Sequence, residues 1–549
     1  MRRLLILGAA LTSATTAAAT DLPRFSNFTY EGRTQEQARA LPGEYLNPIL
    51  SGYYPDPSVT RVGDEYYLAL SSFAHFPGLP IFRSKDLVNW TQIGNAIDRP
   101  GQLDFTGMGT SRAVFAPDIS FHAGTFYIAG TCVDCGGNFV ITAKDAAGPW
   151  SDPIWLPFEG IDPSIYWEGD RAYIVNNRAP AEPPRYEGHR AIWLQEFDWR
   201  AGKMVGESVQ LVNGGVDITK QPVWIEGPHI LRREGWYYLT AAEGGTSVNH
   251  SQVVLRSKAL RGPYRPFAGN PILTQRDLDP ARPHPVTSTG HAKLVQTQRG
   301  DWWATFLGVR PYESDYYNIG RETFLLPVTW KDGWPIILPK DKPVPFTAPR
   351  PNLPRQPQAA TPTSGDFSYV DEFDGKKLGL AWIGIRTPKA PLYQLRAGEL
   401  VLNSGTRLGD LSGAPGYVAR RLQHHVATVA TTVRFSPDKD GERAGLAAVQ
   451  SDRNHLFFGV TRLGGRTSIA LYTSDDGKEQ LVASTPVASG TPVTLTIHAD
   501  AGTMRVQYKV GGETKTLASD VDTRFLSTKV AGGFVGTLIG PYSWVAPSS

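Results

Sequence analysis

The chain has 549 residues and a formal net charge of +3 at pH 7, with 55 Lys and Arg residues scattered among 52 Asp and Glu. At roughly 150 residues per domain, this length predicts two to four domains, so core size is no constraint. Because no basic stripe marks a nucleic-acid face, we expect a small, mostly neutral partner and no nucleic acid. The 56 Gly and 43 Pro, with only 4 Met, favour short strands and tight turns over helices.

The first twenty residues, MRRLLILGAALTSATTAAAT, have the pattern of a secretory signal. Two arginines precede a short apolar run, and three alanines ending at Ala19 match a small-residue cleavage site. We therefore expect residues 1–19 to be a signal peptide and the protein to be exported, either periplasmic or secreted. No later stretch approaches the roughly 20 apolar residues of a membrane helix, so no membrane partner is expected.

The stretch NPILSGYYPDPSVTR, residues 47–61, carries Asp56 between two prolines and behind a pair of tyrosines. Each proline fixes its own φ and biases the residue before it toward extended geometry, so we expect this side chain to leave a stiff, extended backbone. A rigid carboxylate beside aromatic rings suits sugar chemistry. Pro-Asp-Pro-Ser is also ordinary turn composition, and the two interpretations stay open on this stretch alone.

From Gly43 to Lys340 an aromatic-rich strand followed by a second strand recurs five times. Units at irregular spacings of roughly 45 to 65 residues favour a five-bladed β-propeller, whose sheets pack radially around a channel. A β-sandwich with decorated loops is the alternative, although a sandwich usually needs only about 100 residues. The paired segments are 64–73 with 80–90, 124–132 with 138–150, 170–177 with 191–199, 235–245 with 252–264, and 301–311 with 321–330.

The two cysteines, Cys132 and Cys135, lie in the segment CVDCGGN. One such pair without a second pair or a His cluster is weak evidence for zinc, and redox chemistry is not expected without a βαβ context. A local disulfide in an oxidising compartment and two inert thiols in a strand hairpin both fit the pattern.

The C-terminal part of the chain has a different pattern from the repeats. Residues 341–366 are proline-rich and almost without periodicity, which predicts an extended linker or a strap lying over a surface. From 367 to 549, short alternating runs between Gly, Asp and Asn turns predict a β-sandwich. The expected fold class is therefore all-β, with a five-bladed β-propeller at 43–340 followed by a β-sandwich.

Three carboxylates open blades of the expected propeller. Glycoside hydrolysis needs one carboxylic acid and one carboxylate, and the innermost strands of a propeller point side chains into one channel. Asp56 opens the first blade, Asp162 in a second Asp-Pro-Ser opens the third, and Glu226 before Gly-Pro opens the fourth. Burial would raise the pKa of Glu226 toward what a general acid requires. The alternative is that each acid caps a turn at a blade entrance.

Six stretches of the expected propeller carry motifs of a known family, namely YPDPSVTRVGDEYYLALSSF, FAPDISFHAGTFY, GIDPSIYW, EGPHILRREGWYYLTAAEGGT, GHAKLVQTQRGDWW and NIGRETFLLPVTWKDGWP. They resemble glycoside hydrolase family 43, specifically its β-xylosidase and α-L-arabinofuranosidase members. Two C-terminal stretches, YVDEFDGKKLGLAW and GERAGLAAVQSDRNHLFFGV, are similar to the concanavalin-like jelly roll that such members carry.

This resemblance implies an exo-acting, inverting hydrolase that releases xylose or arabinofuranose from hemicellulose oligosaccharides, with a β-xylosidase favoured. It implies Asp56 as general base, Glu226 as general acid, and Asp162 as the residue that orients the acid and tunes its pKa. It also implies that the C-terminal domain helps to close the pocket. No cofactor or metal is expected to be required, although calcium in the channel is compatible. The implied substrate-binding residues are Phe73, Phe115, Thr246, His291 and Arg321.

One departure from the family leaves the sugar open. Xylosidases of this type often read Trp-Ala-Pro-Asp where this chain has Phe115 to Asp118, and a smaller ring would alter the pocket wall. Outside this family reading, a catalytically silent carbohydrate-binding propeller would not need a desolvated Glu226. A fructan-cleaving enzyme would carry a Trp-Met-Asn-Asp-Pro type of entry motif, which is absent. The sequence indicates no oligomeric state.

Overall fold

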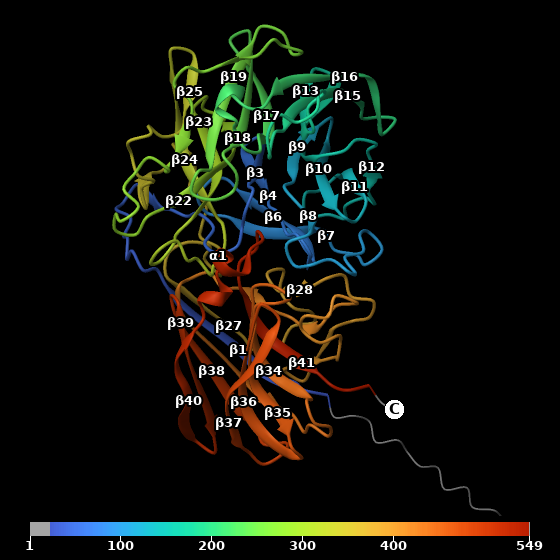
Figure 1. Ribbon diagram of the computed structural model, residues 1–549, viewed down its shortest axis with the longest axis vertical. Coiled ribbons are helices and arrows are strands. Elements are labelled where there is room, and N and C mark those ends of the chain that lie inside the picture. The colour runs from blue at the N-terminus through green and yellow to red at the C-terminus, as the bar shows by residue number, and fades with distance from the viewer. Residues whose placement is uncertain (1–21, 548–549) are drawn as a thin grey trace, which may run out of the picture.

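The computed structural model describes residues 22–547, in which two all-β domains lie one above the other (Figure 1). The signal peptide expected at residues 1–19 lies outside the described residues. Helical structure in the described part is limited to α1 (Thr528–Ala531) and the 3-10 turns η1 (Ile218–Lys220) and η2 (Arg524–Leu526). Between residues 22 and 547 there is no helix with the length and apolar character needed to cross a membrane.

The upper domain is the five-bladed propeller that the repeats predict. Its innermost strands are β3, β9, β13, β17 and β22, and each contacts the next around the ring, with β22 closing onto β3. The blades are β3 (Ser58–Val62), β4 (Glu65–Ala69), β6 (Gly78–Ser84) and β7 (Thr91–Ile97); β8 (Ala113–Val114), β9 (Asp118–His122), β10 (Thr125–Val133), β11 (Gly137–Ala143) and β12 (Ile154–Trp155); β13 (Ile161–Glu168), β14 (Arg171–Arg178), β15 (Ala191–Asp198) and β16 (Lys203–Asn213); β17 (Glu226–Arg233), β18 (Trp236–Glu243), β19 (Ser251–Ser257), β20 (Arg265–Pro266) and β21 (Leu273–Thr274); and β22 (Thr287–Gln296), β23 (Trp302–Val309), β24 (Glu322–Lys331) and β25 (Trp334–Ile336).

The hydrophobic clusters of the propeller lie between neighbouring blades. One cluster joins Tyr66 and Phe82 of the first blade to Trp303 and Leu325 of the last. Strands buried on both faces read as nearly continuous apolar runs, as β10 does. Each aromatic-rich repeat is therefore stable only against its neighbours, which holds the inner strands, and the residues that precede them, in register around the channel.

The lower domain is the predicted β-sandwich, whose two sheets enclose one large core. Strand β33 shows the alternation expected for a strand with one buried face. One sheet contains β1 (Arg24–Arg33), β27 (Phe367–Asp371), β29 (Tyr393–Arg396), β30 (Glu399–Leu402), β33 (Val426–Arg434), β38 (Val493–Asp500), β39 (Thr503–Val510) and β40 (Glu513–Asp522); the other contains β31 (Gly416–Tyr417), β32 (Arg420–Arg421), β34 (Arg443–Val449), β35 (His455–Leu463), β36 (Arg466–Asp475), β37 (Lys478–Pro486) and β41 (Leu538–Trp544).

Strand β1 precedes the propeller in sequence but belongs to the sandwich, where it pairs with β27, β30 and β33. Figure 1 shows this blue strand among the orange and red strands. Phe25, Phe28 and Tyr30 of β1 are buried in the sandwich core. No strand is predicted ahead of Gly43, because the partners of β1 lie more than 300 residues away in the sequence.

Residues 341–366 lie along the propeller as a strap. Within them, β26 (Thr347–Pro349) pairs with β2 (Glu44–Leu46), and Arg350 forms a 2.7 Å ion pair with the buried Asp86 of the first blade. A further short ladder, between β5 (His75–Phe76) and β28 (Gly384–Ile385), joins the first blade to the segment that follows the strap. The sandwich is thereby held against the propeller at several points.

Candidate active site

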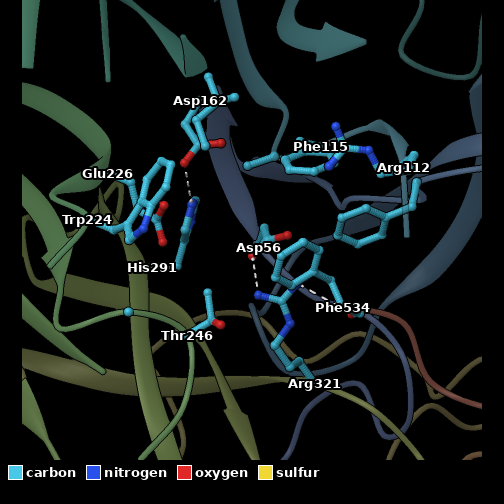
Figure 2. Close-up of a pocket in the computed structure, with 14 residues that line it drawn as sticks. Asp56, Arg112, Phe115, Asp162, Trp224, Glu226, Thr246, His291, Arg321 and Phe534 are labelled. Carbon is cyan, nitrogen blue, oxygen red and sulfur yellow. Dashed lines mark hydrogen bonds and ion pairs between the residues drawn. The ribbon is translucent and has the colours of Figure 1, made fainter. Parts of the chain in front are cut away.

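A pocket of about 400 Å³ lies at the channel mouth, between the propeller and the sandwich. This volume is near the lower end of the roughly 300 to 1,000 Å³ usual for small-molecule sites. Figure 2 shows side chains from every blade and from the sandwich pointing into it. The structure brings together all the residues that the sequence singles out, namely Asp56, Phe73, Phe115, Asp162, Glu226, Thr246, His291 and Arg321.

Asp56 is the most strongly bonded of the three acids. Its Oδ2 accepts a hydrogen bond from Ser71 Oγ at 2.6 Å, and its Oδ1 lies 3.3 Å from Arg321 Nη1. Burial opposes ionisation, but Arg321, His291 and Ser71 together hold the pKa of Asp56 below its ordinary value. The extended backbone predicted for Asp56 is wrong, because its φ is +55°. Its two bonds over-determine a conformation that the flanking prolines do not favour.

Asp162, on the third blade, contacts residues of the fourth and fifth blades. It lies at a bulge in β13 with a φ of +54°, and its Oδ2 accepts a hydrogen bond from the backbone N–H of Gly227 at 3.1 Å. The same oxygen lies 3.4 Å from His291 Nε2. A Cβ on Gly227 would lie 2.7 Å from that nitrogen, so only glycine fits there. Asp162 thus fixes the backbone directly after Glu226.

Glu226 is the first residue of β17 and only 8% of its surface is exposed. In the part of the chain that the structure describes, no donor bonds its carboxyl group. Burial first, and then the negative charge of Asp162, raise the pKa of Glu226 to about 8. Near neutral pH this carboxyl group therefore retains its proton, as a general acid must.

Two buried cations complete the polar floor. Burial opposes protonation of His291, but hydrogen bonding to Asp162 and the negative charges of Asp56 and Asp162 raise its pKa to about 9. Arg321 pairs with Asp56, and its Nη2 donates to the backbone oxygen of Phe534 at 3.4 Å. His291 and Arg321 are thus each paired with a buried carboxylate of the pocket.

Three phenylalanines form the apolar wall of the pocket. The ring centres of Phe73 and Phe115 are 5.2 Å apart, and Phe534 lies 5.7 Å from each. Phe534 comes from the sandwich, between α1 and β41, and its backbone N–H donates to Ser111 Oγ at 2.9 Å. No local pattern in the glycine-rich sequence around Phe534 indicates that it reaches a propeller pocket whose residues all lie more than 200 positions earlier in the chain.

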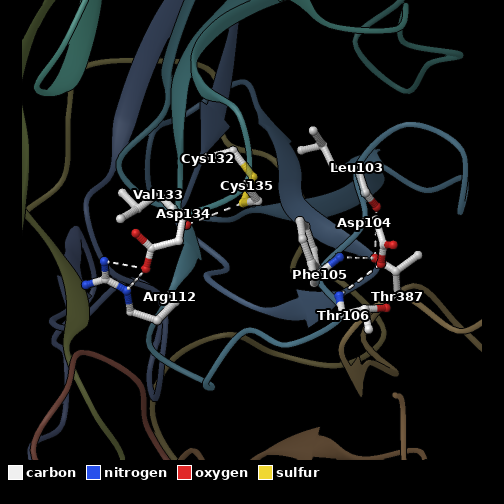
Figure 3. The surroundings of a disulfide bond; sticks show 10 residues. All are labelled: Leu103, Asp104, Phe105, Thr106, Arg112, Cys132, Val133, Asp134, Cys135 and Thr387. Carbon is white, nitrogen blue, oxygen red and sulfur yellow. Dashed lines mark hydrogen bonds and ion pairs between the residues drawn. A yellow bond between two sulfur atoms is a disulfide. The ribbon is translucent and has the colours of Figure 1, made fainter. Parts of the chain in front are cut away.

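Two further lining residues, Arg112 and Trp224, are not among the predicted ones. Trp224 comes two residues before Glu226, so its closeness to the acid could have been predicted from position alone. Arg112 Nη2 lies 2.6 Å from Asp134 Oδ2. Asp134 lies in the turn between β10 and β11 that the Cys132–Cys135 disulfide closes (Figure 3). The structure thus decides for the disulfide over the two inert thiols.

Comparison with known proteins assigns the chain to a family. Residues 45–335 match the model of glycosyl hydrolases family 43. The chain belongs to this family. Residues 370–546 match the β-xylosidase C-terminal concanavalin A-like domain, which agrees with the resemblance of the sandwich sequence.

Similar proteins carry two kinds of name. A xylosidase/arabinosidase of Butyrivibrio fibrisolvens is 37% identical over 90% of this chain and 95% of its own length. A non-reducing end α-L-arabinofuranosidase of Bacteroides ovatus is also 37% identical, with 91% of each chain covered.

Solved structures extend the likeness to both domains. A GH43_12 protein from a capybara gut metagenome has a TM-score of 0.89 and 37% identity, with 95% of this chain and 99% of the other covered. A xylan β-1,4-xylosidase of Bacillus halodurans has a TM-score of 0.83 and 31% identity, with 91% and 96% covered.

Proposed function

We propose that this glycoside hydrolase removes single pentoses from the non-reducing ends of hemicellulose oligosaccharides with inversion at the anomeric carbon. Asp56 is the base that activates water, and Glu226 is the acid that protonates the leaving oxygen. Asp162 orients Glu226 through the Gly227 amide and raises its pKa by like-charge repulsion. An exo mode fits a pocket floor formed by buried side chains.

The observation that carries the proposal is the opposite tuning of two carboxylates in one pocket. Paired acids whose surroundings push their pKa values apart are the usual arrangement for acid and base roles. Arg321 keeps Asp56 ionised, whereas burial beside Asp162 keeps Glu226 protonated. A non-catalytic sugar-binding propeller would gain nothing from burying an acid without a hydrogen-bond donor.

The pH dependence of kcat/KM tests these two assignments. Activity should fall as the pH drops through the lowered pKa of Asp56, because the base becomes protonated. It should also fall as the pH rises through the pKa of Glu226, near 8, because the acid loses its proton. If kcat/KM of the Glu226→Gln variant still fell near pH 8, the assignment of Glu226 as the acid would be contradicted.

Inversion is supported by the placement of the two acids on the first and fourth blades, with a channel between them. An inverting enzyme needs room for a water, with carboxyl groups roughly 6.5 to 9.5 Å apart, whereas a retaining one needs about 5 to 5.5 Å. Proton NMR of the first product should show the inverted anomer. Retained configuration, or a sugar ester trapped on Asp56, would contradict the base role.

For the sugar, we favour xylose and keep arabinofuranose as the second candidate. The concanavalin-like domain and the relatives named β-xylosidase support xylose. Phe115, in place of the tryptophan usual in xylosidases, and the relative named α-L-arabinofuranosidase support the alternative. Side-by-side kinetics on β-xylosyl and α-L-arabinofuranosyl substrates with the same leaving group decide between them.

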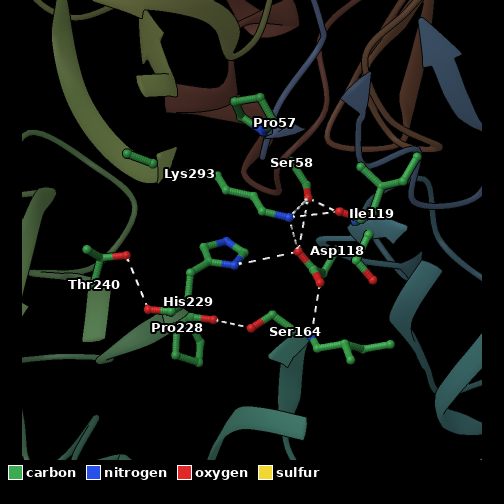
Figure 4. A network of polar contacts seen from close by, with 12 residues as sticks. Pro57, Ser58, Asp118, Ile119, Ser164, Pro228, His229, Thr240 and Lys293 are labelled. Carbon is green, nitrogen blue, oxygen red and sulfur yellow. Dashed lines mark hydrogen bonds and ion pairs between the residues drawn. The ribbon is translucent and has the colours of Figure 1, made fainter. Parts of the chain in front are cut away.

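We also propose that catalysis needs no metal. Below the pocket, Lys293 Nζ donates to Ser58 Oγ at 3.0 Å and to Ile119 O at 2.8 Å, and it pairs with Asp118 Oδ1 (Figure 4). Three protein oxygens thus bind an internal ammonium group. Among residues 22–547, no cluster of three or more His, Cys, Asp or Glu residues could hold a metal ion. Activity unchanged after EDTA treatment is expected, and loss restored by calcium would contradict this.

Export remains part of the proposal. A disulfide forms and persists in oxidising compartments, and the Cys132–Cys135 bond supports a periplasmic or secreted location. Fractionation of the native host, with activity assayed in the periplasm and medium, tests this.

A further inference from the structure

The pocket has two exposed residues at its rim, and both lack a role in the chemistry above. The side chain of Arg112 is 46% exposed and Trp224 is 40% exposed, whereas the three acids are each less than 9% exposed. An exposed Trp and an exposed Arg beside a buried site mark where the pocket opens. They are also side chains well suited to sugars, since an indole offers a flat apolar face and a guanidinium offers several fixed donors.

The acid fixes the direction in which the rest of the substrate leaves. Glu226 must lie within hydrogen-bond reach of the glycosidic oxygen, so the leaving sugar begins beside this carboxyl group. The floor is blocked by buried side chains, and the leaving sugar must therefore extend toward the rim. Resting on the proposed function, we infer that Trp224 and Arg112 bind the leaving sugar, Trp224 by stacking and Arg112 by hydrogen bonds to its hydroxyls.

Trp224 is held in place by its own surroundings. Its backbone N–H donates to Gly188 O at 2.9 Å, and the guanidinium carbon of Arg190 lies 5.3 Å from the indole centre. Trp224 comes two residues before Glu226, so the backbone segment that positions the ring also carries the acid. The platform and the acid are thus positioned together.

Arg112 is held from its charged end. Its Nε donates to Asp134 Oδ2 at 2.7 Å, and its Nη2 lies 2.6 Å from the same oxygen. Asp134 has a φ of +64° in the turn closed by the disulfide, so its carboxylate is presented from a constrained backbone (Figure 3). No described residue accepts a hydrogen bond from Arg112 Nη1, which leaves that group available to a sugar hydroxyl.

The backbone on either side of Arg112 is held as well. Thr110 N–H donates to Asp452 Oδ2 of the sandwich at 2.9 Å, and Ser111 Oγ accepts from the Phe534 N–H. An ordinary exposed ion pair contributes little to stability, roughly 0 to 1 kcal/mol, and would not need such support. The disulfide turn and the sandwich contacts instead pre-organise one guanidinium at the pocket rim, and pre-organisation improves binding.

The test compares two leaving groups in Arg112→Ala. One substrate is a pentose disaccharide, whose leaving sugar has hydroxyls, and the other is a 4-methylumbelliferyl pentoside, whose leaving group has none. A hydrogen bond from a charged donor corresponds to a loss of about 10- to 100-fold in kcat/KM. We expect that loss on the disaccharide and a change below about threefold on the aryl pentoside. Equal changes on both substrates, or no change on either, would overturn the role of Arg112.

Variants around Arg112 sharpen the test. Asp134→Asn and the double variant Cys132→Ser/Cys135→Ser should show the same selectivity to a smaller degree, because Arg112 remains but is less fixed. Arg200→Ala, which removes the exposed 2.6 Å ion pair to Asp170, is the matched control and should change neither rate. Selective loss in Arg200→Ala would also count against the proposal.

Trp224 has its own pair of variants. Trp224→Ala should raise KM for the disaccharide, and Trp224→Phe should restore much of the loss because an aromatic face remains. If KM for the disaccharide were as high in Trp224→Phe as in Trp224→Ala, stacking would be contradicted. If the wild-type enzyme hydrolyses neither the disaccharide nor the aryl pentoside, the proposed function is wrong. If it hydrolyses both, the variants test only whether Trp224 and Arg112 bind the leaving sugar.

Discussion

Two levels of the channel, a few residues apart along the inner strands, use charge in opposite ways. At the pocket end lie acids and a histidine, and a short distance along the same strands lie the residues that surround Asp118 deeper in the channel. The neighbouring pairs, pocket residue first, are Asp56 and Ser58, Asp162 and Ser164, Glu226 and His229, and His291 and Lys293.

The deeper cluster, which consists of Ser58, Asp118, Ser164, His229 and Lys293, matches one carboxylate with one ammonium group and draws one residue from each blade (Figure 4). Asp118 Oδ2 accepts from the Ile165 N–H at 2.9 Å, while its Oδ1 meets Ser58 and Lys293. Burial and Lys293 lower the pKa of His229 to about 3, so this ring stays neutral. Buried charge that is matched in this way holds blades together, whereas the unmatched carboxyl group of Glu226 is available for chemistry.

The largest expected effect is the loss of turnover at the pocket end. Asp56→Asn, Asp162→Asn and Glu226→Gln should each keep the fold and lose about 100- to 10,000-fold in kcat, the usual contribution of one acid or base. Circular dichroism and kcat on an aryl pentoside are the measurements. Glu243→Gln is the control, since Glu243 is equally buried at 8% exposure but does not line the pocket. A near-normal rate in any of the three would remove that residue from the mechanism.

At the paired end, a substitution should cost stability. Lys293→Met leaves Asp118 buried without its counter-charge, and removing one partner of a buried pair costs about 3–5 kcal/mol. Denaturant unfolding measures this difference. The double variant Lys293→Met/Asp118→Asn should recover part of the loss, because no charge is then left unpaired. A double variant less stable than Lys293→Met would show that the charge pair is not the cause.

The sequence predicts those parts of the site that depend on short local motifs. Asp56, Asp162 and Glu226 could be predicted because each lies in a short motif at a blade entrance, and the propeller brings such entrances together. The prediction of an extended backbone at Asp56 is wrong, because hydrogen bonds from Ser71 and Arg321 override the local preference of the prolines.

The parts that could not be predicted depend on contacts across the chain. Strand β1 is an ordinary alternating strand, and nothing in it indicates that its partners begin at Phe367. Phe534 reaches the pocket only because the sandwich docks beside the channel mouth. Lys293 has the local sequence of a surface lysine, and its role appears only when five blades converge on Asp118.

The two catalytic acids should differ in their effect on stability, with opposite signs. Folding raises the pKa of Glu226. The contribution of this group to the free energy of unfolding is therefore fully present below its unfolded pKa and is lost as the pH rises toward 8. The stability of Glu226→Gln relative to the wild type should therefore increase by up to about 1.4 kcal/mol per pH unit between the unfolded pKa of Glu226 and pH 8.

Asp56 gives the reverse trend. Its pKa is lowered by folding, so its contribution is present above the unfolded pKa and is lost as the pH falls. Asp56→Asn should be less stable than the wild type at pH 7, and the difference should shrink in acid. Thermal unfolding at pH 2.5, 3.5, 5.5, 7 and 8 measures both trends, because the Asp56 window lies below its ordinary pKa and the Glu226 window lies above its own. Parallel curves for the two variants would contradict the opposite shifts.

The smallest effect concerns the sandwich side of the pocket. Cutting the chain after the strap is a poor test, because strand β1 would remain with the propeller and lose its partners β27, β30 and β33. A single substitution is cleaner. Phe534→Ala removes one wall of the pocket but keeps the backbone oxygen that accepts from Arg321.

Phe534 touches the bound sugar equally in the ground and transition states if it serves as a wall. Its loss should then raise KM by roughly 3- to 10-fold with little change in kcat, the signature of uniform binding. Phe534→Leu, which keeps most of the apolar volume, should fall between Ala and wild type. A large fall in kcat with KM unchanged would instead show that Phe534 acts through Arg321, whose guanidinium carbon lies 5.4 Å from the ring centre, and so helps to set the charge of Asp56.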